Sequence, residues 1–333
     1  MFRRVSLSLF LALFISTAGR AQSELSVAPL ASPSSDIGTL VGGSGVTRYR
    51  IDRTSGSISL VSGDGVRLSS GGVNRALVTI TCNGTTFCDT SNVQVEVGVD
   101  RSNTGRFQQA ARFRIDRQSG SITGGQSGGQ PRLFQFATLG DGGSASFFVS
   151  HDIRTRPASS GRPFGASTMN WGVTVYHVDD PGNPLTVSTF ARGDVLRPIG
   201  ISQGSVLDFG TLAVGASASG TVTINAASGV RSISGPGVTG LAGSPGGRGV
   251  ATVSGEGGQM ISLSLSSSSI NLTNGTDNLT ANINLDTPTS TSLSGSLGNA
   301  GSVTYGIGGS VNIAGPISGG SYSGTVTATV QYN

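Results

Sequence analysis

Few side chains in this 333-residue sequence could carry out nucleophilic or acid–base chemistry. There are two histidines, His151 and His177, and two cysteines, Cys82 and Cys88. Ser202 lies in GISQG, a pattern typical of hydrolase nucleophiles, but that pattern requires a strand-to-helix turn in an α/β fold, which nothing here indicates. In a chain so rich in glycine and serine, a chance match is expected. We therefore predict no catalytic residues, no cofactor and no enzymatic activity.

The candidates for metal binding are also weak. Two histidines cannot form a His-rich site. The oxygen ligands that Ca²⁺ prefers could be supplied by Asp64 in SGDGV, or by Asp179, Asp180 and Asn183. Neither group has the spacing of a known calcium loop. Because Asp and Asn are common in turns, we predict turn-forming roles for them and no metal site.

The two cysteines are close in sequence, in the stretch TCNGTTFC. In an oxidising compartment, Cys82 and Cys88 are expected to form one local disulfide across a glycine-containing turn. A redox-active pair would more often have two intervening residues, and a zinc site would need further ligands. The predicted disulfide should stabilise the fold by roughly 2 kcal/mol.

The first 21 residues have the pattern of a secretory signal peptide. Arg3 and Arg4 form a charged start, residues 5–15 are apolar, and residues 19–21 include small residues before a cleavage site. The apolar run is too short to span a membrane, and no later stretch approaches eighteen apolar residues. We predict export to the periplasm, cell surface or extracellular space, with no membrane span in the mature chain. A retained N-terminal anchor is the alternative.

All basic residues are arginines, and their number nearly matches that of the acidic residues. Three of the 21 arginines lie in the predicted signal peptide, which leaves 18 against 17 acidic residues and a mature net charge of +1. A nucleic-acid partner is therefore not expected.

The composition predicts strands rather than helices. Glycine accounts for 53 residues and charged residues for only 11%, while apolar residues make up 36% and recur in alternation. Glycine, serine and threonine all disfavour helices, and alternation is typical of half-buried strands. We predict an all-β fold of short strands joined by glycine-rich turns.

An internal repeat indicates two related domains. DIGTL at 36–40 matches DFGTL at 208–212, and the segment 49–66 matches 222–238. The predicted order is a Ser/Pro-rich lead-in at 22–35, an Arg-rich β-sandwich at 36–190, a linker at 191–203 and a second β-sandwich at 204–333. The lead-in would make only a weak donor strand, because Pro29 interrupts its alternation.

A second repeat lies within the first domain, where RYRIDRTSGSIS at 48–59 recurs as RFRIDRQSGSIT at 112–123. One parity of these strands is expected to face the core: Tyr49, Ile51, Phe113 and Ile115. The other parity forms a possible anionic-ligand face: Arg48, Arg50, Arg112 and Arg114. A solvated face with cross-strand charge pairs is the alternative explanation. Trp171 alternates with Met169, Val173 and Val175, so we predict that it belongs to the core rather than to a sugar-stacking surface.

The last residues predict a long closing strand over 320–332. Its polar positions are the odd ones, and its inward positions are the even ones: Tyr322, Gly324, Val326, Ala328, Val330 and Tyr332. Gly320 lies fourteen residues from the end and Tyr332 is penultimate. This pattern resembles the C-terminal strand of fimbrial pilin subunits, which is bound by a periplasmic chaperone and then borders a subunit groove.

With LDFGTL at 207–212, the last 130 residues or so also resemble a family of bacterial secreted β-domains of unknown function, related to spore-coat U and pilin-like domains. The resemblance implies immunoglobulin-like or pilin-like sandwiches and no established activity. It implies a secreted structural or adhesive subunit that assembles by β-strand addition, with Gly320 to Tyr332 facing a chaperone or like subunits. The two-domain layout resembles that of tip adhesins. The alternatives are a self-contained polysaccharide-binding module and, third, an enzyme whose site lies in loops of the first domain.

Overall fold

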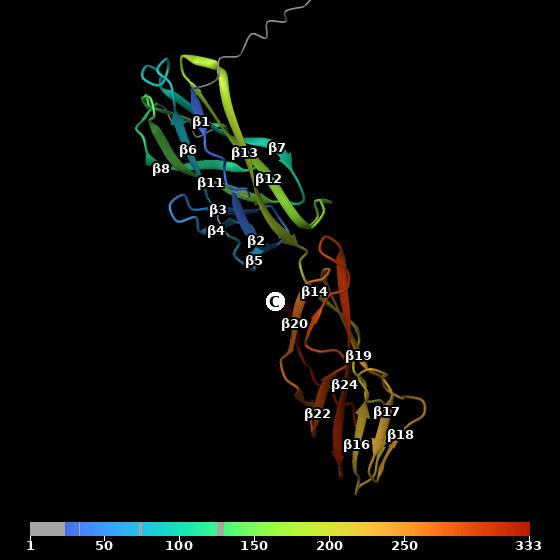
Figure 1. Ribbon diagram of the computed structural model, residues 1–333. Helices are drawn as coiled ribbons and strands as arrows, with labels where there is room; N and C mark the ends of the chain where they lie inside the picture. Colours follow the sequence, from blue (N-terminus) through green and yellow to red (C-terminus); the bar gives the residue numbers. More distant parts are fainter. Residues whose placement is uncertain (1–23, 33, 73–74, 125–129) are drawn as a thin grey trace, which may run out of the picture.

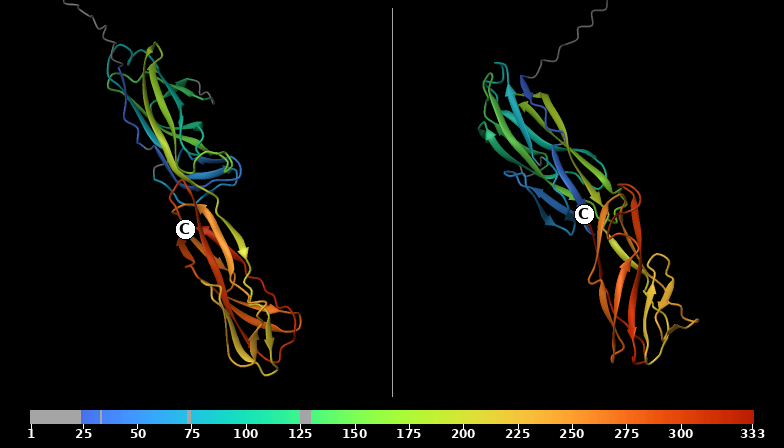
Figure 2. Two further views of the ribbon diagram at one scale, coloured as in Figure 1. Left: turned by 90° about the vertical axis from the view of Figure 1, so that its right-hand side faces the viewer. Right: turned by 60° about the horizontal axis from the view of Figure 1, so that its bottom comes forward.

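The computed structural model describes residues 24–333 except 33, 73–74 and 125–129, so the predicted signal peptide lies outside the described residues. Within these ranges the chain forms 25 strands and no helix, which confirms the all-β prediction. In the same ranges no helix is long and apolar enough to cross a membrane. The strands are arranged in two lobes placed end to end, β1–β13 and β14–β25 (Figures 1 and 2).

The first lobe is a sandwich of two sheets. One sheet has the order β1-β6-β11-β3-β4, with β8 also paired to β11. Its strands are β1 (Leu25–Val27), β3 (Thr47–Ile51), β4 (Ile58–Ser62), β6 (Ala76–Cys82), β8 (Ala111–Ser119) and β11 (Ser144–Thr155). The facing sheet has the order β5-β2-β13-β12-β7-β10-β9, antiparallel except where β13 pairs with β2. Its strands are β2 (Ser35–Val41), β5 (Val66–Arg67), β7 (Val93–Asn103), β9 (Ile122–Gly124), β10 (Arg132–Phe136), β12 (Gly165–His177) and β13 (Asp180–Leu196).

Alternating side chains from both sheets fill the core of this lobe. Trp171 is fully buried, and its indole N–H donates a 3.0 Å hydrogen bond to the Ser34 hydroxyl. The residues predicted to face inward are all buried: Tyr49, Ile51, Phe113, Ile115, Met169, Val173 and Val175. The assignment of Trp171 to the core is therefore confirmed.

The segment predicted as a lead-in is part of the first lobe. Leu25–Val27 forms β1 and pairs antiparallel with β6, and Ser34 is buried against Trp171. The prediction overlooked this short edge strand because three residues of alternation are too few to identify a strand. The pairing also means that this segment is occupied within its own chain.

The second lobe contains a large sheet of order β14-β19-β24-β16-β17, with β22 joining β24 to β21. Its strands are β14 (Gly200–Ser205), β16 (Ser219–Ile224), β17 (Arg231–Ser234), β19 (Gly249–Glu256), β21 (Ser269–Thr273), β22 (Asn278–Leu285) and β24 (Ala300–Ala314). Two small sheets complete the lobe: β15 (Leu212–Val214) with β18 (Val238–Gly240), and β23 (Ser290–Ser292), β20 (Met260–Leu265) and β25 (Ala328–Tyr332) in the order β23-β20-β25.

The predicted linker at 191–203 is mostly strand. Residues up to Leu196 belong to β13 and those from Gly200 belong to β14, so only 197–199 connect the lobes. Leu196 is buried and packs, with Val41, among core residues of the second lobe. The prediction relied on turn-forming residues and missed the long β12–β13 hairpin that carries the chain to the junction. That the two lobes fold as independent domains stays a prediction.

Candidate functional site

The predicted closing strand is shorter than the alternation suggested. Only Ala328–Tyr332 forms a strand, β25, which pairs with β20. Upstream, Ser323 exchanges backbone hydrogen bonds with Thr273 of β21 instead. Between residues 323 and 328 the chain therefore crosses from the sheet of β21 to the sheet of β20. The backbone pairing is interrupted there, although the alternation of side chains continues.

One edge of β25 is open. β20 is its only hydrogen-bonded strand neighbour within the described part of the chain. The amide of Asn333 donates to Met260 and the carbonyl of Thr327 accepts from Ser266, so the odd-numbered residues of β25 direct their backbone groups toward β20. The N–H and C=O groups of Ala328, Val330 and Tyr332 therefore point to the opposite edge.

Strand β14 lies near β25. Some Cα atoms of β14 and β25 come within 8 Å of each other, but no hydrogen bonds pair the two strands. All six residues of β14 are exposed. Two strand edges with free backbone groups thus approach each other near the junction, and in Figures 1 and 2 the C-terminus lies close to this point.

The side chain of Tyr332, at the end of β25, reaches the short connection between the lobes. Its hydroxyl accepts a 2.7 Å hydrogen bond from the Glu256 amide and donates one of 2.9 Å to the Arg197 carbonyl. Tyr332 is 8% exposed, and burial is the main cause that raises the pKa of its hydroxyl. The penultimate tyrosine is therefore a fixed structural contact between the C-terminal strand and the short connection of the lobes.

A buried carboxylate joins the two lobes. Glu256 is fully buried and forms a 2.8 Å ion pair with Arg197, and it also accepts a hydrogen bond from the amide of Gly298. The Arg197 guanidinium lies 4.7 Å from the ring centroid of Phe164, and that of Arg106 lies 3.3 Å from the same centroid. Phe164 thus interacts with one arginine of the first lobe and one of the connection.

Three of the four predicted face arginines surround one buried acid. Asp152 on β11 is fully buried, with Arg114 at 2.8 Å, Arg48 at 3.5 Å and Arg50 at 3.6 Å. Arg112 is not part of this cluster. The β8–β11 register shifts between Ser150 and Asp152, and Arg112 has a φ of 53°, so its exposed side chain leaves the alternation. One carboxylate among three guanidiniums leaves a formal charge of +2.

A polar groove continues from this cluster. Arg154 lies directly opposite Arg48 in the β3–β11 ladder and also lines the groove. The groove has a volume of about 350 Å³ and is lined by Asn103, Gln108, Gln109, Ala110, Ala111, Gln130, Arg154 and Arg156. Amide and guanidinium groups are suited to hydrogen bonding with hydroxyl and carboxylate oxygens. The groove was not predicted, because Gln and Asn in loops give no periodic signal.

The residues considered for catalysis occupy structural positions. His151 is fully buried against Phe113 and Trp171, and burial lowers the pKa of its imidazole to about 4. Ser202 lies on the exposed strand β14, and its hydroxyl donates to the Thr252 carbonyl at 3.3 Å. His151 is thus enclosed in the core of the first lobe, whereas Ser202 lies on an exposed strand of the second lobe.

Two of the carboxylates considered for calcium accept hydrogen bonds from neighbouring groups. Asp64 accepts hydrogen bonds from both the amide (3.0 Å) and the hydroxyl (2.6 Å) of Ser44. The Asn183 amide donates to both carboxylate oxygens of Asp180, at 3.0 and 2.8 Å. Asp64 thus links two loop positions 20 residues apart, and the Asn183–Asp180 contact lies within β13, so the turn-forming roles stay predictions.

Cys82 and Cys88 form the predicted disulfide, and both are fully buried. The sequence did not reveal which groups would lie around it. Glu24, next to β1, and His177, at the end of β12, both reach this disulfide although they are far away in sequence.

Comparison with known proteins identifies a family for the second lobe only. Residues 199–332 match the model of a family described as a domain of unknown function, DUF4402. This range coincides with the segment in which the sequence resembles a β-domain family of unknown function. No curated protein matches the chain. A solved structure among the matches is the ASH / PapD-like domain of human CEP192 (PapD-like domain 7), at 10% identity and a TM-score of 0.23, covering 59% of this chain and 99% of that one.

Proposed function

We propose that this chain is an exported, non-enzymatic bacterial cell-surface protein, structural or adhesive, which assembles by β-strand addition at its second lobe. The observation that carries this proposal is the open edge of β25, where the backbone groups of Ala328, Val330 and Tyr332 point away from β20. An incoming strand would gain main-chain hydrogen bonds there, while alternating side chains set its register. Its source is a periplasmic chaperone or another copy of the chain.

One substitution removes a hydrogen-bond donor of the open edge, together with the packing of the Val330 side chain on the core of the second lobe. Proline has no N–H, and the N–H of Val330 is directed away from β20, so Val330→Pro leaves the internal β20–β25 ladder intact. Gln331→Ala is the matched control, because its backbone faces β20 and its side chain is exposed. We expect the mature wild-type protein from the periplasm to form SDS-resistant oligomers on unboiled gels. Val330→Pro should lose them and Gln331→Ala should keep them.

The contradicting result is equally clear. If the folded, unboiled wild-type protein runs as a single monomer band, or if Val330→Pro keeps the ladder of oligomers, strand addition at β25 is wrong. Circular dichroism of each variant checks that its β-structure is retained, so that loss of oligomers is not caused by unfolding.

A second candidate is a polysaccharide-binding module, favoured by the arginine cluster and the adjoining groove. Three arginines around Asp152 leave excess positive charge, and Arg154 continues into a groove lined by amide groups. This chemistry favours a glycan that carries carboxylates over a neutral one.

Affinity electrophoresis tests the second candidate. The protein should be retarded in gels containing polygalacturonate and not in gels containing dextran. The double variant Arg154→Gln with Arg156→Gln should lose this retardation, while Arg162→Gln, an exposed arginine outside the groove lining, should keep it. Equal mobility in both gels would exclude an acidic glycan as the ligand of this groove.

A further inference from the structure

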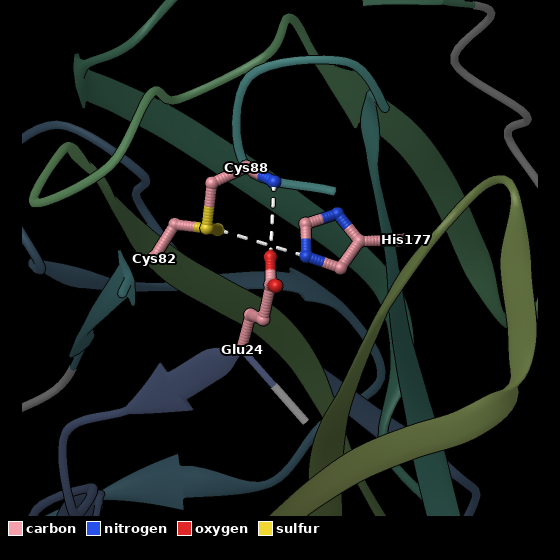
Figure 3. A group of neighbouring side chains, drawn as sticks. All are labelled: Glu24, Cys82, Cys88 and His177. Carbon is pink, nitrogen blue, oxygen red and sulfur yellow. Dashed lines mark hydrogen bonds between the residues drawn. A yellow bond between two sulfur atoms is a disulfide. The ribbon is translucent and has the colours of Figure 1, made fainter. Parts of the chain in front are cut away.

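Four side chains with metal-binding chemistry converge at one end of the first lobe. Glu24, Cys82, Cys88 and His177 each place one ligand atom within 4.8 Å of all the others (Figure 3). No other such group of three or more histidines, cysteines and acids occurs among the described residues. They come from separate elements: the residue before β1, the end of β6, the loop after it and the end of β12.

The contacts inside the cluster are close, and three of its four side chains are buried. Nε2 of His177 lies 3.6 Å from Sγ of Cys82, and the two cysteines and His177 are at most 4% exposed. Glu24 Oε2 accepts hydrogen bonds from the amides of Phe87 at 2.9 Å and Cys88 at 3.2 Å, so its carboxylate is held against the disulfide loop.

The disulfide prevents metal binding as long as it is intact, because its sulfurs are not thiolates. Once it is reduced, the ligand set becomes two thiolates, one imidazole and one carboxylate. Zinc binds such sets tetrahedrally, with ligand atoms on the order of 3.3–3.8 Å apart for typical bond lengths. From the observed spread of 4.8 Å, zinc binding requires the two sulfurs to separate and the Glu24 carboxylate to shift against the loop amides that bind it.

We propose that Glu24, Cys82, Cys88 and His177 bind one zinc ion when the disulfide is reduced, so that disulfide and zinc are alternative cross-links of the same loop. A phosphine reductant breaks the S–S bond, takes an oxygen atom from water to become phosphine oxide, and leaves two protonated thiols. Zinc then displaces the two thiol protons and binds neutral His177 and ionised Glu24. The disulfide joins only Cys82 and Cys88, whereas the zinc ion would also tie their loop to the residue before β1 and to the end of β12.

The test uses the full mature chain, reduced with a phosphine and desalted without oxygen. We expect reduced wild-type protein to bind one Zn²⁺ per chain and to give with Co²⁺ the intense absorption of a tetrahedral thiolate site. The oxidised protein should bind neither ion. Zinc should also raise the melting temperature of the reduced protein and leave that of the oxidised protein unchanged.

Two ligand variants and one control distinguish zinc bound by all four ligands from zinc bound by the two cysteines alone. His177→Phe keeps a ring stacked on Phe87 but removes the nitrogen ligand, and Glu24→Gln keeps an acceptor for the loop amides but removes the charge. Each should weaken zinc binding roughly tenfold or more. Asp89→Asn, a carboxylate of the same loop that contacts the Asp141 amide outside the cluster, should bind as wild type.

Two results would overturn the proposal. One is reduced wild-type protein that binds no zinc at micromolar concentration. The other is zinc affinity and a cobalt spectrum that are the same in wild type, Glu24→Gln and His177→Phe, which would mean that the two thiols alone hold the ion. Circular dichroism of the reduced variants distinguishes loss of ligand from loss of fold.

Discussion

The hydroxyl of Tyr332 donates a 2.9 Å hydrogen bond to the carbonyl oxygen of Arg197, which lies 135 residues earlier in the chain. The same hydroxyl accepts the amide N–H of Glu256, so one side chain links the C-terminal strand, the connection of the lobes and β19. A partner that bound β25 along its open edge would leave these bonds in place. A partner that pulled the strand out of the lobe would have to break them.

The first prediction concerns this hydroxyl. Tyr332→Phe leaves the buried Glu256 amide without an acceptor and should lower the free energy of unfolding by about 1–3 kcal/mol. Tyr322→Phe is the control, because the hydroxyl of Tyr322 bonds the Ser318 carbonyl at the surface. Its effect should stay within roughly 0.5 kcal/mol. Urea unfolding measures both, and equal effects would contradict the structural role given to Tyr332.

The sequence predicted side-chain direction better than it predicted pairing. The alternation around Trp171 identified the buried face of β12, because period two is a local property of a strand. The same alternation over 320–332 did not reveal that the chain changes sheets after Ser323, since pairing depends on which distant strand lies alongside. β1 was missed because its three residues of alternation are too few to identify a strand.

The second prediction concerns the acid beneath the arginines. Asp152→Asn removes the charge that balances Arg48, Arg50 and Arg114, and should destabilise the first lobe. The loss should be below the roughly 3–5 kcal/mol of a fully buried pair, because the three arginines keep contact with water. The formal charge of the cluster rises from +2 to +3, so the variant should bind polygalacturonate more tightly than wild type if the cluster binds anions. Urea unfolding and affinity electrophoresis measure the two effects, and unchanged values in both would refute the role of Asp152.

The sequence indicated only some members of the arginine cluster and of the group around the disulfide. The repeated RYRID and RFRID strands indicated an arginine face, but Asp152 at its centre belongs to a third strand, and the bulge that removes Arg112 is not visible in the pattern. The cysteine pair indicated a disulfide, whereas Glu24 and His177 reach it from 58 residues before Cys82 and 95 residues after it. Contacts across a sandwich depend on topology, which local spacing does not specify.

The third prediction concerns the disulfide itself. Replacing both Cys82 and Cys88 by alanine removes a cross-link that closes a short loop and should lower the free energy of unfolding by roughly 2 kcal/mol on the chain-entropy estimate. Metal-free, reduced wild-type protein should show a similar loss. Urea unfolding in the presence of a chelator measures both, and a reduced wild type as stable as the oxidised one would contradict the expected contribution.

The fourth prediction concerns pH and follows from the burial of His151. Burial lowers the pKa of His151 to about 4 in the folded protein, against an ordinary value of 6.5 for the imidazole, so between these pH values the unfolded chain binds a proton that the folded one does not. The neutral imidazole therefore supports the fold fully above pH 6.5, and this contribution is lost progressively as the pH falls to about 4, by roughly 3 kcal/mol in total.

Urea unfolding at several pH values should show this loss in wild type and a smaller loss in His151→Leu. The lowered pKa of His177 affects wild type and His151→Leu in the same direction. The difference between the pH profiles of these two proteins therefore reports on His151 alone. Parallel pH profiles would mean that His151 is protonated without cost in the folded state.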